Sequence, residues 1–289
     1  MFGIINVNKP AGWTSRDVVN RVQRLVRPAK AGHAGTLDPL ATGVLLVCVG
    51  PATRLIDHLQ QMPKRYVGTF RMGVTSPSDD TELELTPVPN AAVPELADIE
   101  AKLPEFTGDI LQRPPAYSAI KIKGRKAYDL AREGKAVDLA PRPVTIYSVR
   151  VVRYEHPELV LDIECGSGTY IRSLGRDLAE ALGTGAVMSA LERTAIGEFQ
   201  VAESCTPDEI KEQGPEPFLQ SAVGAVAKLP RIELTPADVE TIHHGRSIHR
   251  DGSEHPEWAA IDPNGQLVAL LVPRGNGALG PRMVFKPKR

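Results

Sequence analysis

Residues 32–43 of the chain read GHAGTLDPLATG and run directly into the apolar segment Val44–Val49. Glycine adopts backbone conformations that are closed to other residues, and proline restricts the chain immediately after Asp38. The pattern predicts a tight, pre-set loop that presents one acidic side chain and leads into a buried strand. An ordinary turn, in which Asp38 only bonds to the backbone, is the alternative interpretation.

Composition indicates the class of protein. The chain has 289 residues, 42% of them hydrophobic, so one large domain and a small second domain are expected. No apolar run approaches eighteen residues, and the N-terminal MFGIINVNKPAGW does not read as a signal peptide. Cys48, Cys165 and Cys205 have neither disulfide nor metal-ligand spacing. We therefore expect a cytoplasmic protein with no membrane contact.

Charge is segregated along the chain, although the net charge is only −1. Residues 1–75 carry ten Lys and Arg against three Asp and Glu, and residues 76–112 carry one base against nine acids. Residues 113–135 carry seven bases against two acids. Such blocks create local electric fields that the net charge does not reveal. We interpret the two basic blocks as a phosphate-binding surface and not as ordinary solvated helix faces.

Periodicity and capping residues predict the main elements. Thr14 or Ser15 caps a helix that Pro28 stops, and residues 74–94 read as a long surface loop. Strands and helices mix without regular βαβ alternation, so the fold class is α+β. Further segments with strand or helix patterns are residues 4–7, 44–49, 53–61, 66–72, 95–106, 126–133, 144–154, 159–165, 171–182, 206–213, 236–243, 258–261 and 267–272.

Five blocks of sequence, in order over residues 4–197, resemble those of one enzyme family. GHAGTLDPLATG is similar to the catalytic-aspartate motif of the bacterial tRNA pseudouridine-55 synthases, the TruB family. The blocks that continue the resemblance are KRY at 64–66, PAYSA at 115–119, GTYIR at 168–172 and LERT at 191–194.

The resemblance implies a pseudouridine synthase fold, in which helices and loops flank a mixed, largely antiparallel central sheet. It implies a catalytic domain over residues 1–222 and a small β-rich, PUA-like domain over 223–289 that binds RNA. The implied activity is isomerisation of uridine to pseudouridine at position 55 in the tRNA T-loop, with base flipping. We expect tRNA, through its T stem-loop, as the partner of a monomer without an obligate protein partner.

This chemistry fits what the sequence contains. The glycosidic bond breaks, the uracil rotates and carbon 5 bonds to the ribose, without redox change or an added group. The chain has no dinucleotide fingerprint, phosphate loop, HExxH or paired CxxC, so we expect no cofactor and no metal. A carboxylate can add to an electrophilic carbon, stabilise positive charge on the sugar or take a proton.

By resemblance Asp38 is the catalytic carboxylate, and Arg172 is the arginine that pairs with it. Burial raises a carboxylate pKa, and a cation within about 4–6 Å lowers it again. Tyr66 matches the active-site tyrosine that stacks on the target base and assists catalysis. Without the family match, Arg172 reads as an exposed arginine at a helix start and Tyr66 as a core or edge-strand residue.

Three further residues take substrate-binding roles from the resemblance. His33 enters the place that the flipped uridine vacates, although a lone loop histidine is more often a surface residue. Tyr170 matches a second tyrosine that contacts the substrate. Leu191 matches an apolar wall of the base pocket, where a helical leucine would otherwise read as core. Candidate phosphate contacts are Lys9, Arg21, Arg24, Lys30, Lys64, Lys121, Lys123, Arg125 and Lys126.

One segment departs from the family pattern. Where the family has T-D-T-x-D-x-x-G, residues 75–82 read TSPSDDTE, so a proline replaces the first acid and the glycine is missing. Asp80 is the best match to the second acid. Other interpretations are a non-catalytic RNA-binding or tRNA-folding protein of this fold, and a related enzyme acting on another RNA. A glycosidase is a weaker interpretation, because a glycosidase normally needs two carboxylates and the motif core contains only one.

Overall fold

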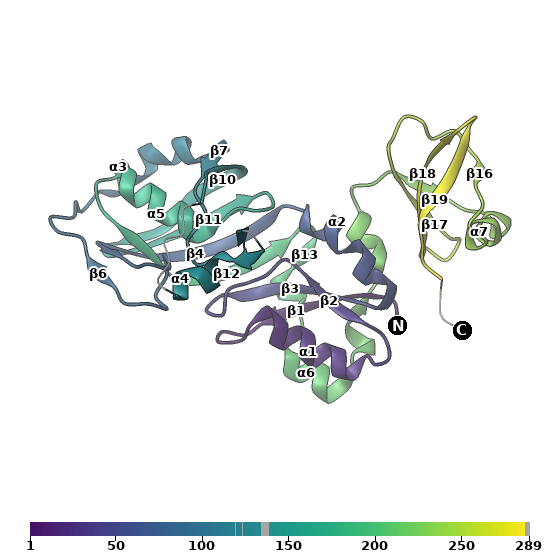
Figure 1. Cartoon of the computed structure of the whole chain (residues 1–289), viewed down its shortest axis with the longest axis horizontal. Helices are drawn as coiled ribbons and strands as arrows, with labels where there is room; N and C mark the ends of the chain where they lie inside the picture. Colours follow the sequence, from purple (N-terminus) through teal and green to yellow (C-terminus); the bar gives the residue numbers. More distant parts are fainter. Residues whose placement is uncertain (119, 123, 134–138, 287–289) are drawn as a thin grey trace.

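The computed structural model describes residues 1–118, 120–122, 124–133 and 139–286, and its centre is one large sheet (Figure 1). The sheet has the order β14-β1-β3-β12-β4-β11-β10-β7, with β2 beside β3 and β13 beside β12. Its strands are β1 (Gly3–Lys9), β2 (Ala31–Ala34), β3 (Thr42–Val49), β4 (Lys64–Met72), β7 (Gly108–Gln112), β10 (Arg142–Glu155), β11 (Glu158–Cys165), β12 (Ala186–Ile196), β13 (Phe199–Gln200) and β14 (Leu219–Gln220).

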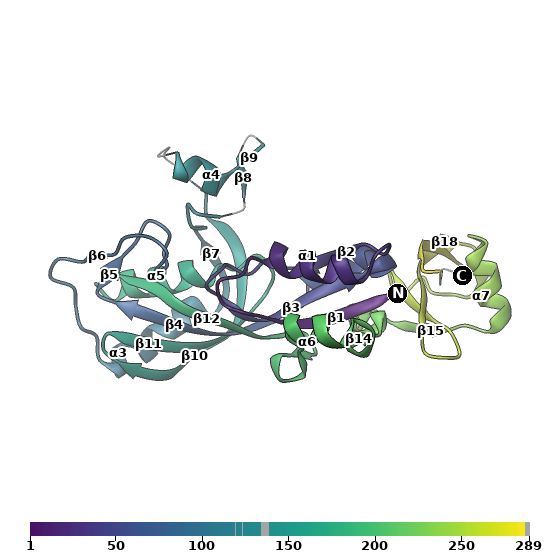
Figure 2. The ribbon, with the colours of Figure 1, turned by 90° about the horizontal axis from the view of Figure 1, so that it is seen from below.

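Most of the helices and short ribbons lie around this sheet, and one helix, α7 (Pro236–His243), lies beside a second, smaller sheet. The α-helices are α1 (Ser15–Leu25), α2 (Ile56–Gln60), α3 (Leu96–Lys102), α4 (Ala127–Arg132), α5 (Ile171–Ala181), α6 (Pro207–Gln213) and α7 (Pro236–His243). The 3-10 turns are η1 (Gly50–Leu55), η2 (Leu103–Phe106), η3 (Val201–Glu203), η4 (Glu216–Phe218) and η5 (Ala222–Val226). The ribbons pair β5 (Val74–Thr75) with β6 (Thr86–Pro87) and β8 (Lys121–Ile122) with β9 (Arg125–Lys126). Figure 2 shows β8, β9 and α4 projecting away from the large sheet. No helix within the described ranges has the length and apolar character needed to cross a membrane.

Strand β3 is buried on both faces, which explains its unbroken apolar sequence. Its even-numbered residues, such as Leu46, pack with Ile4 and Ala34, and its odd-numbered residues, such as Val47, pack against α1 and α6. The predicted buried strand is therefore confirmed. Among the described strands, β3 pairs in parallel with β12 and the other pairs of the sheet are antiparallel, so the sheet is mixed and largely antiparallel as expected.

Helix α1 begins at the predicted capping residue. The Thr14 side chain accepts a hydrogen bond from the Asp17 amide, and the Asp17 carboxylate accepts one from the Thr14 amide. This capping box satisfies amides that have no partner within the helix. Val18, Val19 and Val22 then face the core.

A buried carboxylate joins the three strands β4, β11 and β10. Asp162 on β11 accepts two hydrogen bonds from Arg65 at 2.8 and 2.6 Å, and its Oδ2 accepts two more from Arg150. The bonds from Arg65, and then those from Arg150, lower the pKa of Asp162 to about 2 although burial opposes them. The predicted strand pair over 144–165 is thus confirmed as a hairpin and tied to β4 by charge.

Replacing Asp162 with asparagine is expected to lower the free energy of unfolding at pH 7 by about 1–2 kcal/mol. The folded-state pKa lies below the unfolded value, so the stabilisation is present above about pH 4 and is lost as pH falls toward 2. Urea unfolding of both proteins between pH 7 and pH 3 measures this. A difference in stability that stays constant or widens toward pH 3 would contradict the assignment.

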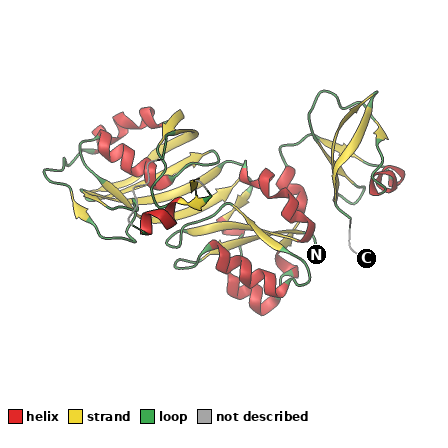
Figure 3. Ribbon diagram, viewed as in Figure 1, coloured by secondary structure: helices red, strands yellow, loops and turns green. Residues whose placement is uncertain are grey.

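A smaller sheet lies at one end of the molecule with α7 beside it (Figure 3). Its order is β15-β17-β18-β19-β16, and it has its own buried cluster, which includes Leu234 and Ile242. Phe285 stacks on Phe2 with ring centroids 5.2 Å apart, and Arg54 donates to the Val284 carbonyl at 2.9 Å. Those contacts join the two sheets through the N-terminal strand region. The strands are β15 (Arg231–Glu233), β16 (Ile248–His249), β17 (Trp258–Ile261), β18 (Leu267–Gly275) and β19 (Ala278–Val284).

Candidate active site

The stretch over residues 32–43 is only partly a loop, which corrects the prediction of a single tight loop. Residues 32–34 belong to β2, which pairs antiparallel with β3 so that His33 lies opposite Val47. The connection from residue 35 to residue 41 carries Asp38. Gly43 has a φ of +94°, and a Cβ there would lie 2.2 Å from the Arg193 carbonyl oxygen, so β12 approaches too closely for a side chain.

Asp38 and Arg172 form an ion pair, as the resemblance implies. The Arg172 Nε lies 3.1 Å from Asp38 Oδ2, and Nη2 donates to Oδ1 at 3.3 Å. Arg172 is the second residue of α5 and its side chain is only 6% exposed, whereas that of Asp38 is 35% exposed. The reading of Arg172 as a surface arginine is excluded. Asp38 keeps one side open to solvent while its other side meets a buried cation.

The segment that departs from the family pattern folds onto the same arginine. Asp80 is 3% exposed and lies 3.2 Å from Arg172 Nη1, which also donates to the Ser78 carbonyl at 2.7 Å. Asp79 next to it pairs with Arg176, one turn further along α5, at 2.6 Å. The interpretation of residues 74–94 as a surface loop is therefore wrong at 78–80, because the two arginines of α5 hold these residues in the interior.

Asp80 is a second carboxylate beside Asp38, which the motif core does not show. Its Oδ1 accepts hydrogen bonds from the Ser78 hydroxyl at 2.5 Å and from the Glu82 amide at 3.0 Å. An acid that is buried and bonded in this way fixes Arg172 and its own loop. Asp38 is the more exposed of the two, so it is the carboxylate that can meet a substrate.

Burial raises the pKa of Asp38 above its ordinary value. The Arg172 guanidinium opposes that rise, and the Asp80 carboxylate adds to it. Arg172 is thus shared by two acids and also donates to the Tyr117 carbonyl at 3.1 Å, so its position depends on several partners. The Arg172 cation therefore favours the ionised form of Asp38 against the effect of burial.

Tyr66 and Leu191 lie in one apolar cluster with Leu37 and Ala41, on either side of Asp38 in the sequence. Tyr66 is buried on β4, and burial raises the pKa of its phenol. Leu191 is on β12, opposite Gly68 of β4, and so its reading as a helical leucine is wrong. The cluster gives the Asp38 loop an apolar wall that extends from two neighbouring strands.

Tyr170 and His33 take different places around this centre. Tyr170 is the N-cap residue of α5, and Arg142 lies over its ring at 5.4 Å and donates to its hydroxyl at 3.3 Å. His33 is half-buried, and its Nδ1 has no hydrogen-bond partner among the described residues. In the described structure neither side chain is hydrogen-bonded to Asp38.

Arg193 is a site residue that sequence reasoning did not single out. It is 1% exposed, and it donates to the Val44 carbonyl at 2.7 Å and to the Gly35 carbonyl at 3.0 Å. It therefore ties β12 to the start of the Asp38 connection and to strand β3, which follows it. The LERT block contains this arginine two residues after Leu191. Arginines are rarely buried, however, so a sequence pattern does not predict that this one is.

Two of the candidate phosphate contacts are wrong. Lys9 is fully buried and donates to the carbonyls of Pro10, Trp13 and Pro39. Lys64 is 7% exposed and donates to backbone carbonyls, including that of Met62 at 2.6 Å. Both lysines hold backbone segments in place through these hydrogen bonds and do not face solvent. Burial lowers the pKa of each to about 8.

The other candidates differ in what the structure shows. Arg24 and Lys30 are exposed and Arg21 is partly exposed. Arg125 is exposed and pairs with Glu133. Lys123 lies outside the described residues, as does Ala119 of the PAYSA block. Within the described ranges, no three His, Cys, Asp or Glu side chains gather in a way that could hold a metal ion.

Comparison with solved structures defines the class of fold. The chain aligns with the protein in "Crystal Structure of a Cbf5-Nop10-Gar1 Complex" at a TM-score of 0.75 and 28% identity, covering 99% of this chain and 85% of that chain. It also aligns with the protein in "Structure of H/ACA RNP bound to a substrate RNA containing 2'-deoxyuridine" at a TM-score of 0.75 and 26% identity, covering 99% of this chain and 86% of that chain. The α+β pseudouridine synthase fold expected from the sequence is confirmed.

Sequence comparison defines the family. Residues 23–171 match the TruB family pseudouridylate synthase N-terminal domain, 172–216 match the tRNA pseudouridylate synthase B C-terminal domain, and 229–285 match the tRNA pseudouridine synthase II C-terminal region. Proteins named tRNA pseudouridine synthase B are similar over nearly full length. That of Arthrobacter sp. (strain FB24) is 42% identical over 99% of this chain and 97% of the relative, and that of Dehalococcoides mccartyi (strain CBDB1) is 39% identical over 99% and 97%. The chain belongs to the TruB family.

Proposed function

We propose that the protein isomerises uridine 55 in the T-loop of tRNA to pseudouridine. The observation that carries this proposal is the partly exposed Asp38 carboxylate held against the buried Arg172, at the position of the family's catalytic motif. Relatives of this chain are named for the same reaction class on tRNA. Family membership favours an enzyme over the non-catalytic RNA-binding protein.

Each site residue has a proposed role that its environment supports. Asp38 is the catalytic carboxylate, and Arg172 keeps it ionised. Tyr66 stacks on the everted uracil, an interaction worth roughly 1–3 kcal/mol in single-strand binding proteins, and assists proton transfer as a protonated phenol. Leu191 and Tyr170 line the base pocket from β12 and from the start of α5.

His33 is proposed to take the place of the flipped base in the stack. Burial, followed by the charges of Arg16 and Arg193, lowers the pKa of His33. The imidazole is therefore neutral at pH 7, which suits insertion between stacked bases.

Replacing His33 with alanine is expected to reduce kcat/KM on folded tRNA by about tenfold or more, because flipping a stacked base costs a few kcal/mol. Activity on a short unstructured oligonucleotide of the same sequence should change little, since its uridine is already unstacked. The two substrates are compared in one assay for wild type and variant. Abolished activity on the oligonucleotide would place His33 in the chemistry instead.

The domain division and the assembly state belong to the same proposal. Residues 1–222 form the catalytic domain, and residues 223–289 form an accessory, PUA-like RNA-binding domain built on the five-stranded sheet. A monomer without an obligate protein partner or cofactor suffices, because one chain supplies Asp38, Arg172 and Tyr66. The three cysteines are buried free thiols, which supports a reducing cytoplasm as the location.

Tritium release from tRNA labelled at carbon 5 of uridine tests the function. Rearrangement bonds carbon 5 to the ribose and so releases its hydrogen to water. We expect release from tRNA with a uridine at position 55, and none from the same tRNA with cytidine there. A binding protein would release tritium from neither, and an enzyme for another RNA would fail on both tRNAs while acting on that RNA.

A further inference from the structure

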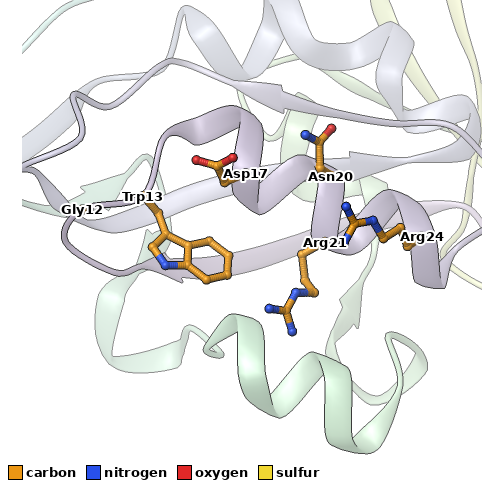
Figure 4. A pocket seen from close by; sticks show the side chains of 6 residues that line it. All are labelled: Gly12, Trp13, Asp17, Asn20, Arg21 and Arg24. Atoms are coloured by element: carbon orange, nitrogen blue, oxygen red, sulfur yellow. The ribbon is translucent and has the colours of Figure 1, made fainter.

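A cationic groove runs along helix α1, outside the centre formed by Asp38 and Arg172. It encloses about 380 Å³, and Figure 4 shows the side chains that line it. We call it the α1 groove, and its residues are Gly12, Trp13, Asp17, Asn20, Arg21 and Arg24. The spacing of the last four, at 17, 20, 21 and 24, places them on one face of the helix.

The α1 groove holds polar groups that the protein itself does not use. In the described part of the chain, Arg24 has no carboxylate partner, and neither the Asn20 amide nor the Trp13 indole N–H has a hydrogen bond. Asn20 and Arg24 are exposed, so both can reach a ligand. Asn20 and Arg24 are one helical turn apart, and such a pair of donors without partners favours an acceptor with several oxygens, such as a phosphate.

Arg21 adds a second cation, which is held in position but not neutralised. Its guanidinium lies 5.4 Å from the centre of the Trp13 ring and 3.7 Å from Asp208 of α6. Asp208 is 80% exposed, and an ion pair this long and exposed is weak. The Asp17 carboxylate at the other end of the groove is engaged in the capping box with Thr14. The Arg21–Arg24 end of the groove is therefore the positive end.

The α1 groove is continuous with the loop that carries Asp38. Gly12 donates its amide to the Pro39 carbonyl at 2.9 Å. The buried Lys9 then bridges the Trp13 carbonyl at 2.7 Å and the Pro39 carbonyl at 3.1 Å. The turn that ends in Trp13 and the connection after Asp38 thus form one hydrogen-bonded unit. The Gly12–Trp13 end of the groove therefore lies next to the connection that carries Asp38.

We propose that the α1 groove binds a backbone phosphate of the tRNA T-arm, on the strand that leads to the everted uridine. Arg24 and Arg21 neutralise the phosphate, Asn20 donates to one of its oxygens, and the Trp13 ring supports Arg21. Contacts of this kind position RNA without reading its sequence. The proposal depends on the proposed function, because it takes tRNA as the ligand.

Salt-dependent binding tests the groove. Kd for an isolated T stem-loop is measured from low to high salt for wild type, R24Q and R21Q/R24Q. Each phosphate contact contributes about 0.7–0.9 to the slope of log K against log salt, so R24Q should lower that slope by about one and weaken binding about three- to tenfold. R21Q/R24Q should weaken binding further but lower the slope by only about one in total, because both arginines neutralise the same phosphate.

R71Q is the matched control. Arg71 is an exposed arginine of β4, five residues from Tyr66, and so it lies on the opposite face of the sheet. We expect wild-type affinity and slope from R71Q. The proposal is overturned if R24Q and R71Q give the same Kd and slope, whether both are unchanged or both are weakened equally.

The design separates this failure from failure of the proposed function. Tritium release by the wild-type protein in the same preparation reports the function without reference to the groove. If the wild-type protein releases tritium but R24Q and R71Q bind the RNA equally, only the phosphate-binding role of the groove is refuted. If the wild-type protein releases no tritium, the proposed function is refuted. The salt slopes then still report whether the groove binds this RNA.

Discussion

Replacing Asp38 with asparagine is expected to reduce tritium release from tRNA by at least about 10³-fold. The amide has the shape of the carboxylate, but it cannot accept a proton or act as an anionic nucleophile. Arg172 should stay in place, because Asp80 and the carbonyls of Ser78 and Tyr117 still hold it. The loss therefore reports chemistry and not collapse of the site.

Single-turnover assays with enzyme in excess measure this loss, and thermal unfolding serves as its control. Asn can deamidate to Asp, so D38A is assayed beside D38N to detect regenerated enzyme. Both variants should bind tRNA within a few-fold of wild type. A D38A protein that is folded and still releases tritium at a tenth of the wild-type rate or more would refute the catalytic role.

Replacing Arg172 with alanine is the second large effect, and it should lower the rate by about 10²- to 10³-fold. It removes a buried cation that faces two carboxylates, so Asp80 is left buried without its counter-charge. Breaking a buried ion pair in this way costs about 3–5 kcal/mol of folding free energy. The affinity for tRNA should change little, because the Arg172 side chain is only 6% exposed and its hydrogen bonds go to protein groups.

The pH dependence separates the electrostatic role of Arg172 from a purely structural one. Asp38 must be ionised to act, so the rate falls as pH drops through its pKa. Because Arg172 opposes the rise that burial causes, its loss should move the midpoint of the acidic limb to higher pH. R172K keeps the charge and should keep the midpoint near that of wild type, although it lacks the guanidinium's several contacts. Equal midpoints in R172A and wild type would count against the pairing.

Local sequence rules predicted the elements that depend on neighbours in the chain. The capping residues before α1, the apolar run of β3 and the hairpin of β10 with β11 all occur where the pattern placed them. The same rules misread three features. His33 lies on a strand because β2 pairs with β3, Leu191 lies on β12, and residues 78–80 are buried by arginines almost a hundred positions away.

Lys9, Lys64 and Arg193 show why pattern reading reached its limit. A cation in a sequence is read as exposed, since leaving water is costly for a charge. Here backbone carbonyls of the turns around the site accept the hydrogen bonds of all three side chains. The carbonyls of Pro39, Gly35 and Val44 are distant in sequence from Lys9 and Arg193, and they reach these side chains only when β1, β3 and β12 have assembled into one sheet.

The sequence by itself indicated the chemistry, because the motif blocks around Asp38, Tyr66 and Arg172 predict the side chains that carry it. Only the tertiary structure decided their electrostatic state. Arg172 meets both Asp38 and Asp80 because α5 and two separate loops converge on one buried point. Charge interactions depend on distance and on exclusion of water, and neither quantity is written in the order of residues along a chain.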